Sequence, residues 1–590
     1  MSRRSGRQPA SRRRRRRGRA SLRLRACFLA VAFVVSLFAG RLLQLQGVDA
    51  NAYAAMAQQE GTHTAVLAAP RGQIVDRFGT ALAESVGAAM LTADPSMTAR
   101  SATRIAAVLS ARLGLDYIDM VEVLRTPDTR FAYLARHLRP QHADAVVSEL
   151  NRRNLGGVFT AADTLRSYPA KDVGANVVGF VGADGNGLAG LEYALNDELS
   201  GRDGAETFEV GPDGSRIPLA HSVIEQPRPG TGVALTIDRD LQWYAQRRLK
   251  TAVQASGGSS GSLVVLDVRT GELLALADWP SVDPRNVEDA DATSLGARSI
   301  QDVYEPGSVE KVLTASALVD AGLVTPRTKI TVPPALDRGG HTIRDYFPHG
   351  TLRLTMTGVL SVSSNLGTVL ASELMGDQAL YRYLRAFGLG ARTELGLPGE
   401  SAGLLPPASS WERINHDTIS FGQGLSVTAV QMAAAVAAVA NGGVRVDPTL
   451  IKGYLGPDGS LTPAPPPARH RVISPRAATA VTSMMEAVTA PDGTAPLAAI
   501  PGYRVAGKTG TAQRADSTCG CYRGTTVSFA GFAPADEPRF LTYVVVQEPD
   551  SGSGGGSTGG PVFHDVMSYA LEKYGVPPTG ARPPKIPTTW

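Results

Sequence analysis

An uncharged apolar segment near the start constrains this chain more than any other feature. Residues 26–40 read ACFLAVAFVVSLFAG, fifteen residues without a charge, and apolar residues continue past Arg41 to Leu45. A transmembrane helix needs about 20 mostly apolar residues, and an arginine near its end can extend its guanidinium to the interface. The sequence therefore predicts one membrane-spanning helix at 26–46, long enough to cross a bilayer once.

Charge predicts the direction in which this helix inserts. Residues 1–25 contain 12 Arg and no acidic residue, and because the whole chain has a net charge of only +5, the remainder is net negative. The positive-inside rule then keeps residues 1–25 in the cytoplasm and exports everything after Val48. An arginine run also suits a nucleic-acid-binding arm. The apolar segment directly behind it favours the membrane, and we expect no nucleic-acid partner.

A cleaved signal peptide is the alternative, since it too has a basic start and an apolar stretch of this length. No clean A-x-A cleavage site follows Phe38, and apolar residues continue beyond it. We therefore favour an uncleaved, single-pass anchor in the plasma membrane. Both alternatives place the bulk of the chain outside the cytoplasm.

The three cysteines suit an exported protein without building a disulfide framework. Cys27 lies in the predicted anchor, and Cys519 and Cys521 form a C-x-C pair in STCGCYRG. This pair can stay as two thiols in a surface loop or close one local bridge. A metal site needs more ligands than the neighbourhood offers, so we expect neither a metal nor another cofactor.

Length and composition predict more than one folded unit. The chain has 590 residues, of which 43% are hydrophobic, with 63 Gly and 39 Pro, as in globular proteins that contain many turns. In RGQIVDRFGTALAES, a short strand, a turn at Gly79 and a return strand predict a hairpin. Helical periodicity follows over residues 100–155, and a further helix is expected at 191–199. These patterns predict a mixed α/β module at 47–230.

A more regular pattern begins near Pro229 and predicts a second domain at 231–575, with a tail at 576–590. A long helix at 239–256 precedes two strands that form a hairpin around Gly271, and later helices lead to two final strands. This order predicts an α+β fold in which an antiparallel sheet is flanked by helices. Composition predicts surface loops or short linkers at 463–469 (PAPPPAR) and 551–560 (SGSGGGSTGG).

Three short motifs in the exported part contain candidate catalytic residues. In YEPGSVEKV, Ser308 and Lys311 are three residues apart, on one face of a predicted helix. A serine needs a base within hydrogen-bond reach to act as a nucleophile, and Lys311 is a candidate for that base. Taken alone, Ser308 is better explained as the N-cap of a helix that starts after Pro-Gly.

Two further motifs change that interpretation. SVSSNLG contains Ser363, Ser364 and Asn365, and VAGKTGTAQ contains K-T-G at 508–510 at the head of a predicted strand. An S-x-x-K motif, a triplet of the S-D-N type and a K-T-G motif, in this order, are a signature of class A β-lactamases and penicillin-binding proteins. Each motif arises easily by chance, but all three within one exported region indicate a serine enzyme of this kind.

Longer segments resemble the class B penicillin-binding proteins, which are monofunctional peptidoglycan D,D-transpeptidases. Residues 71–83 are similar to the family pattern R-G-x-I-x-D-R-N-G-x-x-L-A, with Phe78 where Asn is usual. GLAGLEYALNDELSG, LTIDRDLQ and FGQGLSVTAVQMAAAVAAVANGG follow in the family's order. The resemblance covers nearly the whole chain beyond the anchor. It implies an elongated N-terminal pedestal of the dimerisation type and then a penicillin-binding transpeptidase domain. No glycosyltransferase module fits before Gly232, which argues against a bifunctional class A protein.

The resemblance also implies a role for each residue of the first two motifs. Ser308 attacks the penultimate D-Ala carbonyl of a stem peptide that ends in D-Ala-D-Ala. Lys311 accepts the serine proton, because burial and the nearby Lys508 lower its pKa. Ser363 relays a proton to the leaving amine, and Asn365 holds Lys311 and the substrate amide. β-Lactams are then expected to acylate Ser308 covalently.

The K-T-G strand is implied to bind the donor peptide. Lys508, Thr509 and Thr511 receive its terminal carboxylate, and Gly510 belongs to the same substrate-binding strand. The backbone N–H groups of Ser308 and Thr511 form the oxyanion hole, where loss of one donor typically costs about 3 to 4 kcal/mol of transition-state stabilisation. No metal takes part in this reaction.

Two other functions share parts of the pattern. A class A β-lactamase deacylates with a glutamate that lies in an E-x-x-x-N pattern, whereas Glu412 and Asn415 in WERIN are only three residues apart. A non-catalytic scaffold or antibiotic sensor predicts damaged motifs, yet all three motifs are intact. We therefore expect a transpeptidase.

Other polar residues near the motifs are expected to be structural. Ser364 is interpreted as structural, and Glu310, where the family often has an apolar residue, is expected to be solvated or paired beside the cleft. His349 and His416 are expected to be surface or core polar groups without a catalytic role.

The resemblance is to the FtsI type, which favours septal synthesis over elongation, as do the moderate length and the absence of C-terminal repeats after Tyr574. The arginine-rich tail and the glycine-rich loops look actinobacterial. By resemblance, the partners are a lipid II polymerase of the FtsW/RodA type and divisome proteins, contacted through the anchor and the pedestal. The acceptor amine stays open.

Overall fold

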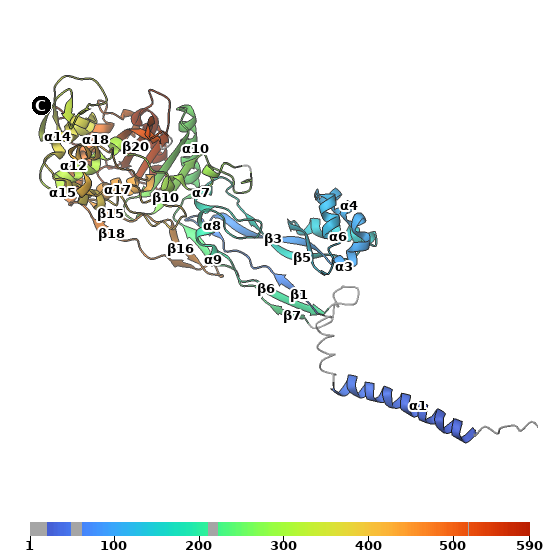
Figure 1. The fold of residues 1–590 in the computed structure, drawn as a ribbon. Coiled ribbons are helices and arrows are strands. Elements are labelled where there is room, and N and C mark those ends of the chain that lie inside the picture. The colour runs from blue at the N-terminus through green and yellow to red at the C-terminus, as the bar shows by residue number, and fades with distance from the viewer. Residues whose placement is uncertain (1–19, 49–61, 210–221, 289, 517–518) are drawn as a thin grey trace, which may run out of the picture. The chain divides into compact units, whose positions relative to one another are not determined.

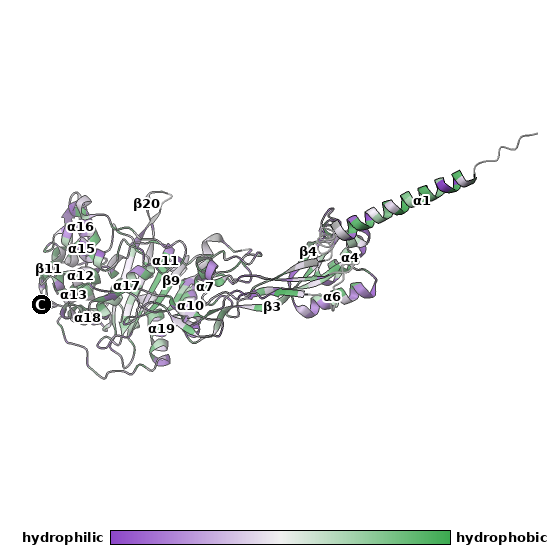
Figure 2. Cartoon of the chain, turned by 90° about the horizontal axis from the view of Figure 1, so that it is seen from below, coloured by the Kyte–Doolittle hydropathy of each residue, from purple (hydrophilic) through white to green (hydrophobic). Residues whose placement is uncertain are grey.

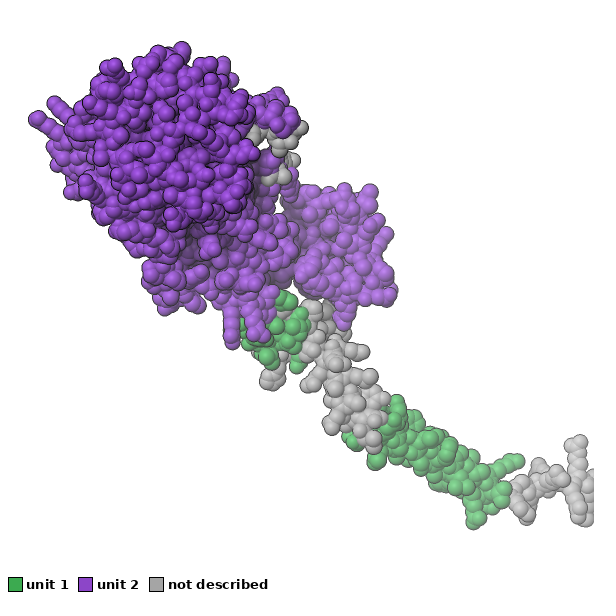
Figure 3. All heavy atoms as spheres, turned by 60° about the vertical axis from the view of Figure 1, so that its left-hand side comes forward, with its two compact units in different colours: residues 1–66, 205–226 green, residues 67–204, 227–590 purple. Residues whose placement is uncertain are grey.

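The computed structural model describes residues 20–48, 62–209, 222–288, 290–516 and 519–590 (Figure 1). Most of the arginine-rich tail predicted at 1–25 lies outside the described residues. The chain divides into two compact units, which are residues 1–66 with 205–226 and residues 67–204 with 227–590 (Figure 3).

The first unit contains a helix at the predicted anchor. Helix α1 (Ala20–Leu43) continues into a π-helical turn at Gln44–Val48. Among the described residues, Ala20–Gly47 is the one helix long and apolar enough to cross a membrane, with a mean hydropathy of 2.2 and no buried side chain. Hydrophobic residues predominate along it (Figure 2). The same unit holds a three-stranded sheet of β1 (Thr62–Leu67), β6 (Gly204–Glu209) and β7 (Ser222–Glu225), in the order β1-β6-β7.

The second unit begins with the predicted hairpin. Strand β2 (Ile74–Val75), a turn with Gly79 at φ +86°, and β3 (Ala81–Ala93) follow one another. Because β3 is long, it pairs antiparallel with both β4 (Ala132–Leu138) and β5 (Val158–Ser167). The expectation of a hairpin here is confirmed.

Helices cover these strands and bury one apolar cluster. Helices α4 (Ala102–Leu113) and α6 (Pro140–Arg152) contribute Ile105, Leu109 and Leu150 to it. The helix expected at 191–199 is instead two short helices, because the backbone at Leu195 leaves the helical conformation between them. The short helices of this module are α3 (Pro95–Thr98), a 3₁₀ turn at Ala99–Ser101, α5 (Tyr117–Val123), α7 (Ala175–Val178), α8 (Gly190–Ala194) and α9 (Asn196–Leu199).

A buried ion-pair network joins three distant segments of the module. Glu192, whose side chain is fully buried, accepts from Arg71 Nε at 2.6 Å and from Arg166 Nε at 2.7 Å. The Arg71 guanidinium also donates to the Glu192 carbonyl at 2.6 Å. A buried charge is tolerated when it is paired and hydrogen-bonded in this way. The first arginine of the RGQIVDR segment therefore has a structural role, linking the hairpin to α8.

A five-stranded antiparallel sheet forms the centre of the following domain, in the order β10-β9-β21-β20-β19. Its strands are β9 (Ser260–Asp267), β10 (Leu273–Trp279), β19 (Ala506–Asp516), β20 (Cys521–Ala533) and β21 (Phe540–Gln547). The hairpin predicted around Gly271 joins β9 and β10. Strand β19, which carries K-T-G, lies at one edge, so one side of its backbone is free of ladder partners in the sheet.

Helices cover both faces of this sheet, as the α+β expectation requires (Figure 1). Leu241 of α10 (Arg239–Ala255) and Phe563 of α19 (Gly560–Lys573) lie in the apolar cluster on one face. The larger cluster includes Leu313 of α12 (Lys311–Asp320), with α17 and α18. The predicted fold class is confirmed.

The domain has further helices and strands, and these strands belong to other sheets. The further elements are β8 (Gly232–Leu235), α11 (Arg298–Gln301), β11 (Lys329–Val332), β12 (Leu336–Arg338), β13 (His341–Ile343), β14 (Leu352–Thr355), α13 (Met356–Ser361), α14 (Asn365–Ser372), α15 (Asp377–Ala386), α16 (Arg413–Ser420), α17 (Ala429–Ala440), β15 (Val444–Val446), β16 (Ile451–Leu455), β17 (Leu461–Pro463), β18 (Arg469–Arg471) and α18 (Pro475–Thr489), with 3₁₀ turns at Ala292–Ser294, Gly307–Val309, Ala408–Ser410 and Pro496–Ala498.

The prediction of a loop or linker at 551–560 is wrong for its second half. Gly555–Gly559 forms a π-helical turn that leads into α19. A Cβ atom on Gly555 would lie 2.2 Å from Ser528 O and 2.8 Å from Gly510 O. The glycines are there because the turn packs directly on the backbone of the K-T-G strand and its neighbour, which composition cannot reveal.

The end of the chain is packed against β14. Thr355 donates from its backbone N–H to Thr588 O at 3.0 Å and from its hydroxyl to Pro587 O at 2.6 Å. The Trp590 indole donates to Leu354 O at 3.1 Å. Thr355 is also the N-cap of α13, the helix that leads into the second motif. The last residues therefore brace that helix.

This packing makes Gly358 in α13 intolerant of a side chain. A Cβ atom there would lie 1.9 Å from Thr588 O, so Gly358→Ala must displace the end of the chain or the helix. We expect a loss of about 1 to 3 kcal/mol, typical of overpacking, read as a lower Tm of the purified exported part.

Gly350→Ala is the matched control, since nothing lies within 4 Å of a Cβ at that position. Equal melting temperatures for the two variants would show that the end of the chain does not brace α13.

Candidate active site

Ser308 lies in a tight turn pressed against the K-T-G strand. The 3₁₀ turn Gly307–Val309 leads into α12, and Gly307 has φ +53° and donates its N–H to Gly422 O at 2.9 Å. A Cβ atom on Gly307 would lie 2.8 Å from Thr511 O. Glycine at this position therefore allows the serine turn to contact β19 directly.

Lys311 is fully buried and is bound from two sides by the second motif. Its Nζ donates to Ser363 O at 2.7 Å and to Asn365 Oδ1 at 2.7 Å, and lies 3.4 Å from Ser363 Oγ. A buried amine is destabilising unless it is hydrogen-bonded. Ser363 and Asn365 supply those bonds, so the S-x-N motif determines where the amine lies.

Lys508 approaches the same serine from the sheet. Its Nζ, also fully buried, donates to Ser363 Oγ at 2.8 Å and to Thr509 O at 3.0 Å. Ser363 adopts φ +60°, which is strained for a residue with a side chain. Strain of this kind persists only where surrounding contacts maintain it, and here two lysines bind the strained residue.

Burial changes the protonation of both lysines. It lowers the pKa of Lys311 to about 7, although the charge of Asp345 opposes the change. Burial, together with the charge of Lys311, lowers the pKa of Lys508 well below its ordinary value. Two desolvated amines that contact one hydroxyl destabilise each other's charged form. An unprotonated amine is therefore available near neutral pH.

The K-T-G strand has one exposed and one buried threonine, on either side of Gly510. Thr511 is exposed, while Thr509 is buried and its hydroxyl lies 3.1 Å from that of Thr494. A Cβ atom on Gly510 would lie 2.2 Å from Ser528 Oγ and 3.0 Å from Pro306 O. Glycine at 510 is thus required for the sheet and the serine turn to meet.

The structure brings seven of the eight predicted site residues into one bonded or packed cluster, namely Lys311, Ser363, Asn365, Lys508, Thr509, Gly510 and Thr511. Ser308 lies at the edge of this cluster. In the described part of the chain, its hydroxyl makes no hydrogen bond to Lys311 or to the other motif residues. Catalytic hydrogen bonds are often long before substrate binds.

Two acidic residues near the site were not singled out from the sequence. Asp345 accepts from Ser364 Oγ at 2.6 Å and from Leu366 N at 2.9 Å. Glu305, three residues before Ser308, accepts from Gly424 N at 2.9 Å, and burial raises its pKa. Their proximity to the motifs was a weak signal, because a lone acidic residue in a turn usually faces solvent.

Comparison with known proteins assigns both parts of the second unit to families. Residues 261–568 match the model of the Penicillin binding protein transpeptidase domain, and residues 66–235 match that of the Penicillin-binding Protein dimerisation domain. The chain belongs to the class B penicillin-binding proteins. It is a serine peptidoglycan D,D-transpeptidase and a target of β-lactams.

Named class B relatives are similar over almost their whole length. Penicillin-binding protein PbpB of Mycolicibacterium smegmatis is 38% identical over 93% of this chain and 90% of its own. Peptidoglycan D,D-transpeptidase FtsI of Escherichia coli is 33% identical over 93% and 91%. The crystal structure of Penicillin binding protein 3 from Mycobacterium tuberculosis with aztreonam covers 89% of this chain and 100% of its own, at 34% identity and a TM-score of 0.70. The family inferred from the motifs is confirmed.

Neighbouring polar residues of this class B protein have structural partners. Ser364 is the N-cap of α14, where its hydroxyl accepts from Gly367 N at 2.9 Å. The pair that resembled a β-lactamase motif is also a cap, since Glu412 N donates to Asn415 Oδ1 at 2.9 Å at the start of α16. The spacing of three residues is that of a capping box, so these residues belong to a helix end.

The expectation for Glu310 is wrong. Its side chain is not solvated beside the cleft but fully buried at the N-cap of α12, where both carboxyl oxygens lie within hydrogen-bond distance of Thr314 Oγ1, at 2.8 and 3.1 Å. Burial raises the pKa of Glu310 well above its ordinary value. The error arises because a position next to Lys311 in the sequence does not reveal whether the side chain of Glu310 faces the solvent or the core.

The two histidines are polar groups that pair with carboxylates. His349 Nε2 lies 3.0 Å from Asp345 Oδ2, and His416 Nδ1 lies 2.7 Å from Asp377 Oδ1. Both rings are largely shielded from solvent, with side-chain exposures of 5% and 8%. This agrees with the expectation of core polar groups.

The C-x-C pair forms a disulfide near the tip of the β19–β20 hairpin. Cys519 and Cys521 are bonded to each other, which answers a question that the sequence left open. The adjacent Tyr522 hydroxyl donates to Glu305 Oε1 at 3.1 Å. The hairpin is thus tied to the segment just before Ser308.

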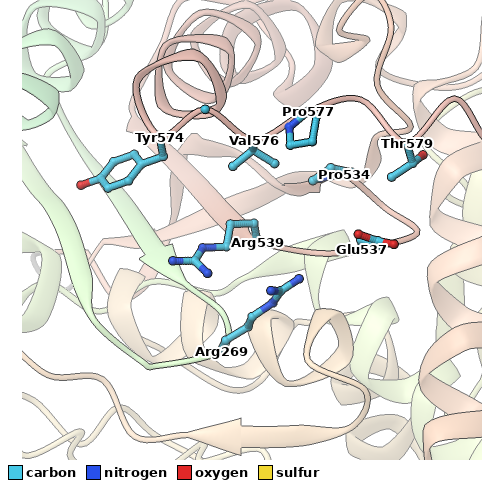
Figure 4. A pocket seen from close by; sticks show the side chains of 9 residues that line it. Arg269, Pro534, Glu537, Arg539, Tyr574, Val576, Pro577 and Thr579 are labelled. Carbon is cyan, nitrogen blue, oxygen red and sulfur yellow. The ribbon is translucent and has the colours of Figure 1, made fainter.

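A second cavity of about 460 Å³ lies away from the three motifs (Figure 4). Arg269 at the β9–β10 turn, Arg539 at the start of β21 and Tyr574 at the end of α19 are among the side chains that line it. None of the motif residues is among the residues that line it.

Glu310 yields a test of the buried carboxyl. Because its folded-state pKa is raised, the stability that it contributes is fully present below the unfolded pKa of about 4.3 and is lost as pH rises toward the folded value, by at most about 1.4 kcal/mol per pH unit. We expect the Tm of Glu310→Gln, relative to that of the wild type, to increase from pH 5 to pH 8. Glu288→Gln, an exposed position, is the control, and a constant difference for Glu310→Gln would contradict the assignment.

Proposed function

We propose that Ser308 is the nucleophile of this transpeptidase and that Lys311 is its general base. The observation that supports this most directly is the network of Lys311, Ser363, Asn365 and Lys508, which holds an unprotonated amine at the start of the helix that follows Ser308. A neutral amine can accept a proton from a serine hydroxyl, whereas an ammonium cannot.

In the acylation step, Ser308 Oγ attacks the carbonyl carbon of the penultimate D-Ala while its proton passes to Lys311 Nζ. The tetrahedral oxyanion is stabilised by the backbone N–H groups of Ser308 and Thr511. The peptide bond then breaks, and Ser363, which contacts both lysines, relays a proton to the departing D-Ala amine. An ester between Ser308 and the donor peptide remains.

We propose that the donor peptide binds along β19. An edge strand has unpaired N–H and C=O groups to which an extended peptide can add. Lys508, Thr509 and Thr511 are proposed to receive its terminal carboxylate, and Gly510 keeps the strand close to the serine turn. A carboxylate raises the pKa of an amine beside it, so the bound donor favours the charged form of Lys508.

In the second half-reaction, the amine of another stem peptide attacks the ester carbonyl and its proton passes to Lys311 Nζ. Lys311 then donates that proton to Ser308 Oγ as the ester bond breaks, which leaves an amide cross-link and the free serine. A serine β-lactamase would instead need a group that activates water. Glu412 and Asn415, the nearest match to such a pair, form a helix cap, which favours cross-linking over hydrolysis of the ester.

Covalent labelling tests the nucleophile. Incubation of the purified exported part with a fluorescent penicillin should give one stable adduct that is lost in Ser308→Ala, because the label is an ester of the Ser308 hydroxyl. Ser410→Ala, in an exposed 3₁₀ turn, is the control and should label as the wild type does. Labelling that persists in Ser308→Ala contradicts the proposal, and rapid release of the label supports a β-lactamase.

The pH dependence of labelling tests the base. Since the pKa of Lys311 is lowered to about 7, the acylation rate should rise tenfold per pH unit below that value and level off above it. Lys311→Arg keeps the charge but cannot accept a proton near neutral pH. We expect its rate to fall at least about 100-fold, the lower range of general-base effects. A normal rate in this variant rules out Lys311 as the base.

We further propose that residues 26–46 anchor the protein with its N-terminus in the cytoplasm and that residues 47–230 form the pedestal below a transpeptidase domain at 231–575. The 12 Arg before the apolar helix support this orientation. The proposed partners are a lipid II polymerase of the FtsW/RodA type and divisome proteins, bound through the anchor and the pedestal.

Septal synthesis is the proposed cellular role, supported by the similarity to FtsI, and elongation is the alternative. Depletion of the protein distinguishes them, because loss of septal cross-linking blocks division while growth continues. We expect depleted cells to lengthen into filaments or branches without completed septa, scored by microscopy with a membrane dye. Rounding of the cells would support the elongation role.

A further inference from the structure

A buried acidic residue lies directly behind the second motif, on the loop between β13 and β14. The Asp345 side chain has no exposed surface and accepts three hydrogen bonds, from Ser364 Oγ at 2.6 Å, Leu366 N at 2.9 Å and His349 Nε2 at 3.0 Å. None of these partners belongs to the proposed catalytic set. Two of them belong to the first turn of α14, which carries Asn365.

We propose that Asp345 is a positioning residue for the reaction, which holds Ser363 and Asn365 against Lys311 and places a buried negative charge behind that lysine. The inference rests on the proposed role of Lys311 as the base. It assigns Asp345 two separable effects, one geometric and one electrostatic.

The geometric effect passes through Ser364. This residue lies between Ser363 and Asn365, both of which bind Lys311, and its hydroxyl connects Asp345 to Gly367 N of α14. Strained backbone such as that of Ser363 must be held by its surroundings. Asp345 supplies part of that restraint through its hydrogen bond with Ser364, the residue that follows Ser363.

The same loop also orients the Asn365 amide. Asn365 Nδ2 donates to the backbone carbonyl of Arg344 at 3.0 Å, while Oδ1 accepts from Lys311. An amide has one donor end and one acceptor end, so the loop contact directs the oxygen toward the lysine. Arg344 thereby holds Asn365, and Asp345 holds Ser364, the residue between Ser363 and Asn365.

The electrostatic effect depends on every charged group around Asp345. Arg344 and His349 lie on its own loop, Lys311 and Glu310 on α12, and Lys508 on β19. His349 contacts two acceptors, since its Nδ1 lies 2.5 Å from Gly350 O and its Nε2 lies 3.0 Å from Asp345 Oδ2. The charge of Asp345 opposes the lowering of the Lys311 pKa by burial, and a hydrogen bond from His349 Nε2 to Asp345 partly offsets that charge.

Variants of Asp345 separate the two effects through the pH profile of penicillin acylation. Asp345→Asn removes the charge, so Lys311 loses its proton more easily and the acidic limb of the profile should move about half a pH unit or more to lower pH. Asp345→Glu keeps the charge but shifts the carboxylate, so it should lower the plateau rate with the limb at the wild-type position. A merely structural residue would lower the plateau equally in both variants and leave both limbs unmoved.

His349→Gln should move the acidic limb in the opposite direction to Asp345→Asn, and this test does not depend on the stability of the Asp345 variants. Without the hydrogen bond from the His349 ring, the charge of Asp345 is less compensated, so the limb should move to higher pH. Asp337→Asn, on the exposed neighbouring hairpin, is the control and should leave the profile unchanged.

The outcomes distinguish this inference from the proposed function. A wild-type profile without an acidic limb overturns the role of Lys311 itself. A wild-type limb that stays in place in both Asp345→Asn and His349→Gln overturns only the inference about Asp345. If Asp345→Asn does not fold, the test rests on the shift of the acidic limb in His349→Gln. A limb that stays in place or moves to lower pH in that variant contradicts the proposal.

Discussion

The site depends on the burial of the Lys311 amine, which has no exposed surface. Desolvation of an ammonium group is expensive, and a protein either pairs such a group or removes its proton. Here both occur, because Ser363 and Asn365 supply hydrogen bonds and burial lowers the pKa to about 7. The same burial that lowers the pKa of Lys311 also makes its hydrogen bonds to the second motif necessary for stability.

Close backbone approach is the second requirement, and glycine meets it at several places. Gly307 lets the serine turn contact Thr511, Gly510 lets the strand pass close to Pro306 O, and Gly555 packs on the same strand from behind. A methyl group at any of them would lie within 3 Å of another segment. Because side chains are absent at these points, residues far apart in the chain share a cluster a few ångströms wide.

Local patterns predicted much of the fold. The hairpin at Gly79, the hairpin at Gly271 and the long helix α10 follow from turn residues and periodicity that neighbours along the chain determine. Burial of polar residues did not follow. Glu310 resembles a surface residue in the sequence, yet the packing of α12 places it in the core, and Asp345 has no local signature because its partners are on α14.

By itself, the sequence determined the apolar anchor segment, the order of the three motifs, the eight site residues proposed from them and the family. These depend on composition or on residues within one turn or strand. Only the tertiary structure decided that Glu310 is buried, that residues 555–559 pack on the K-T-G strand, that Cys519 and Cys521 are joined, and that Asp345 lies behind Asn365. The physical reason is that burial and close approach depend on which distant segments meet, and hydrophobic packing of the whole chain determines those meetings.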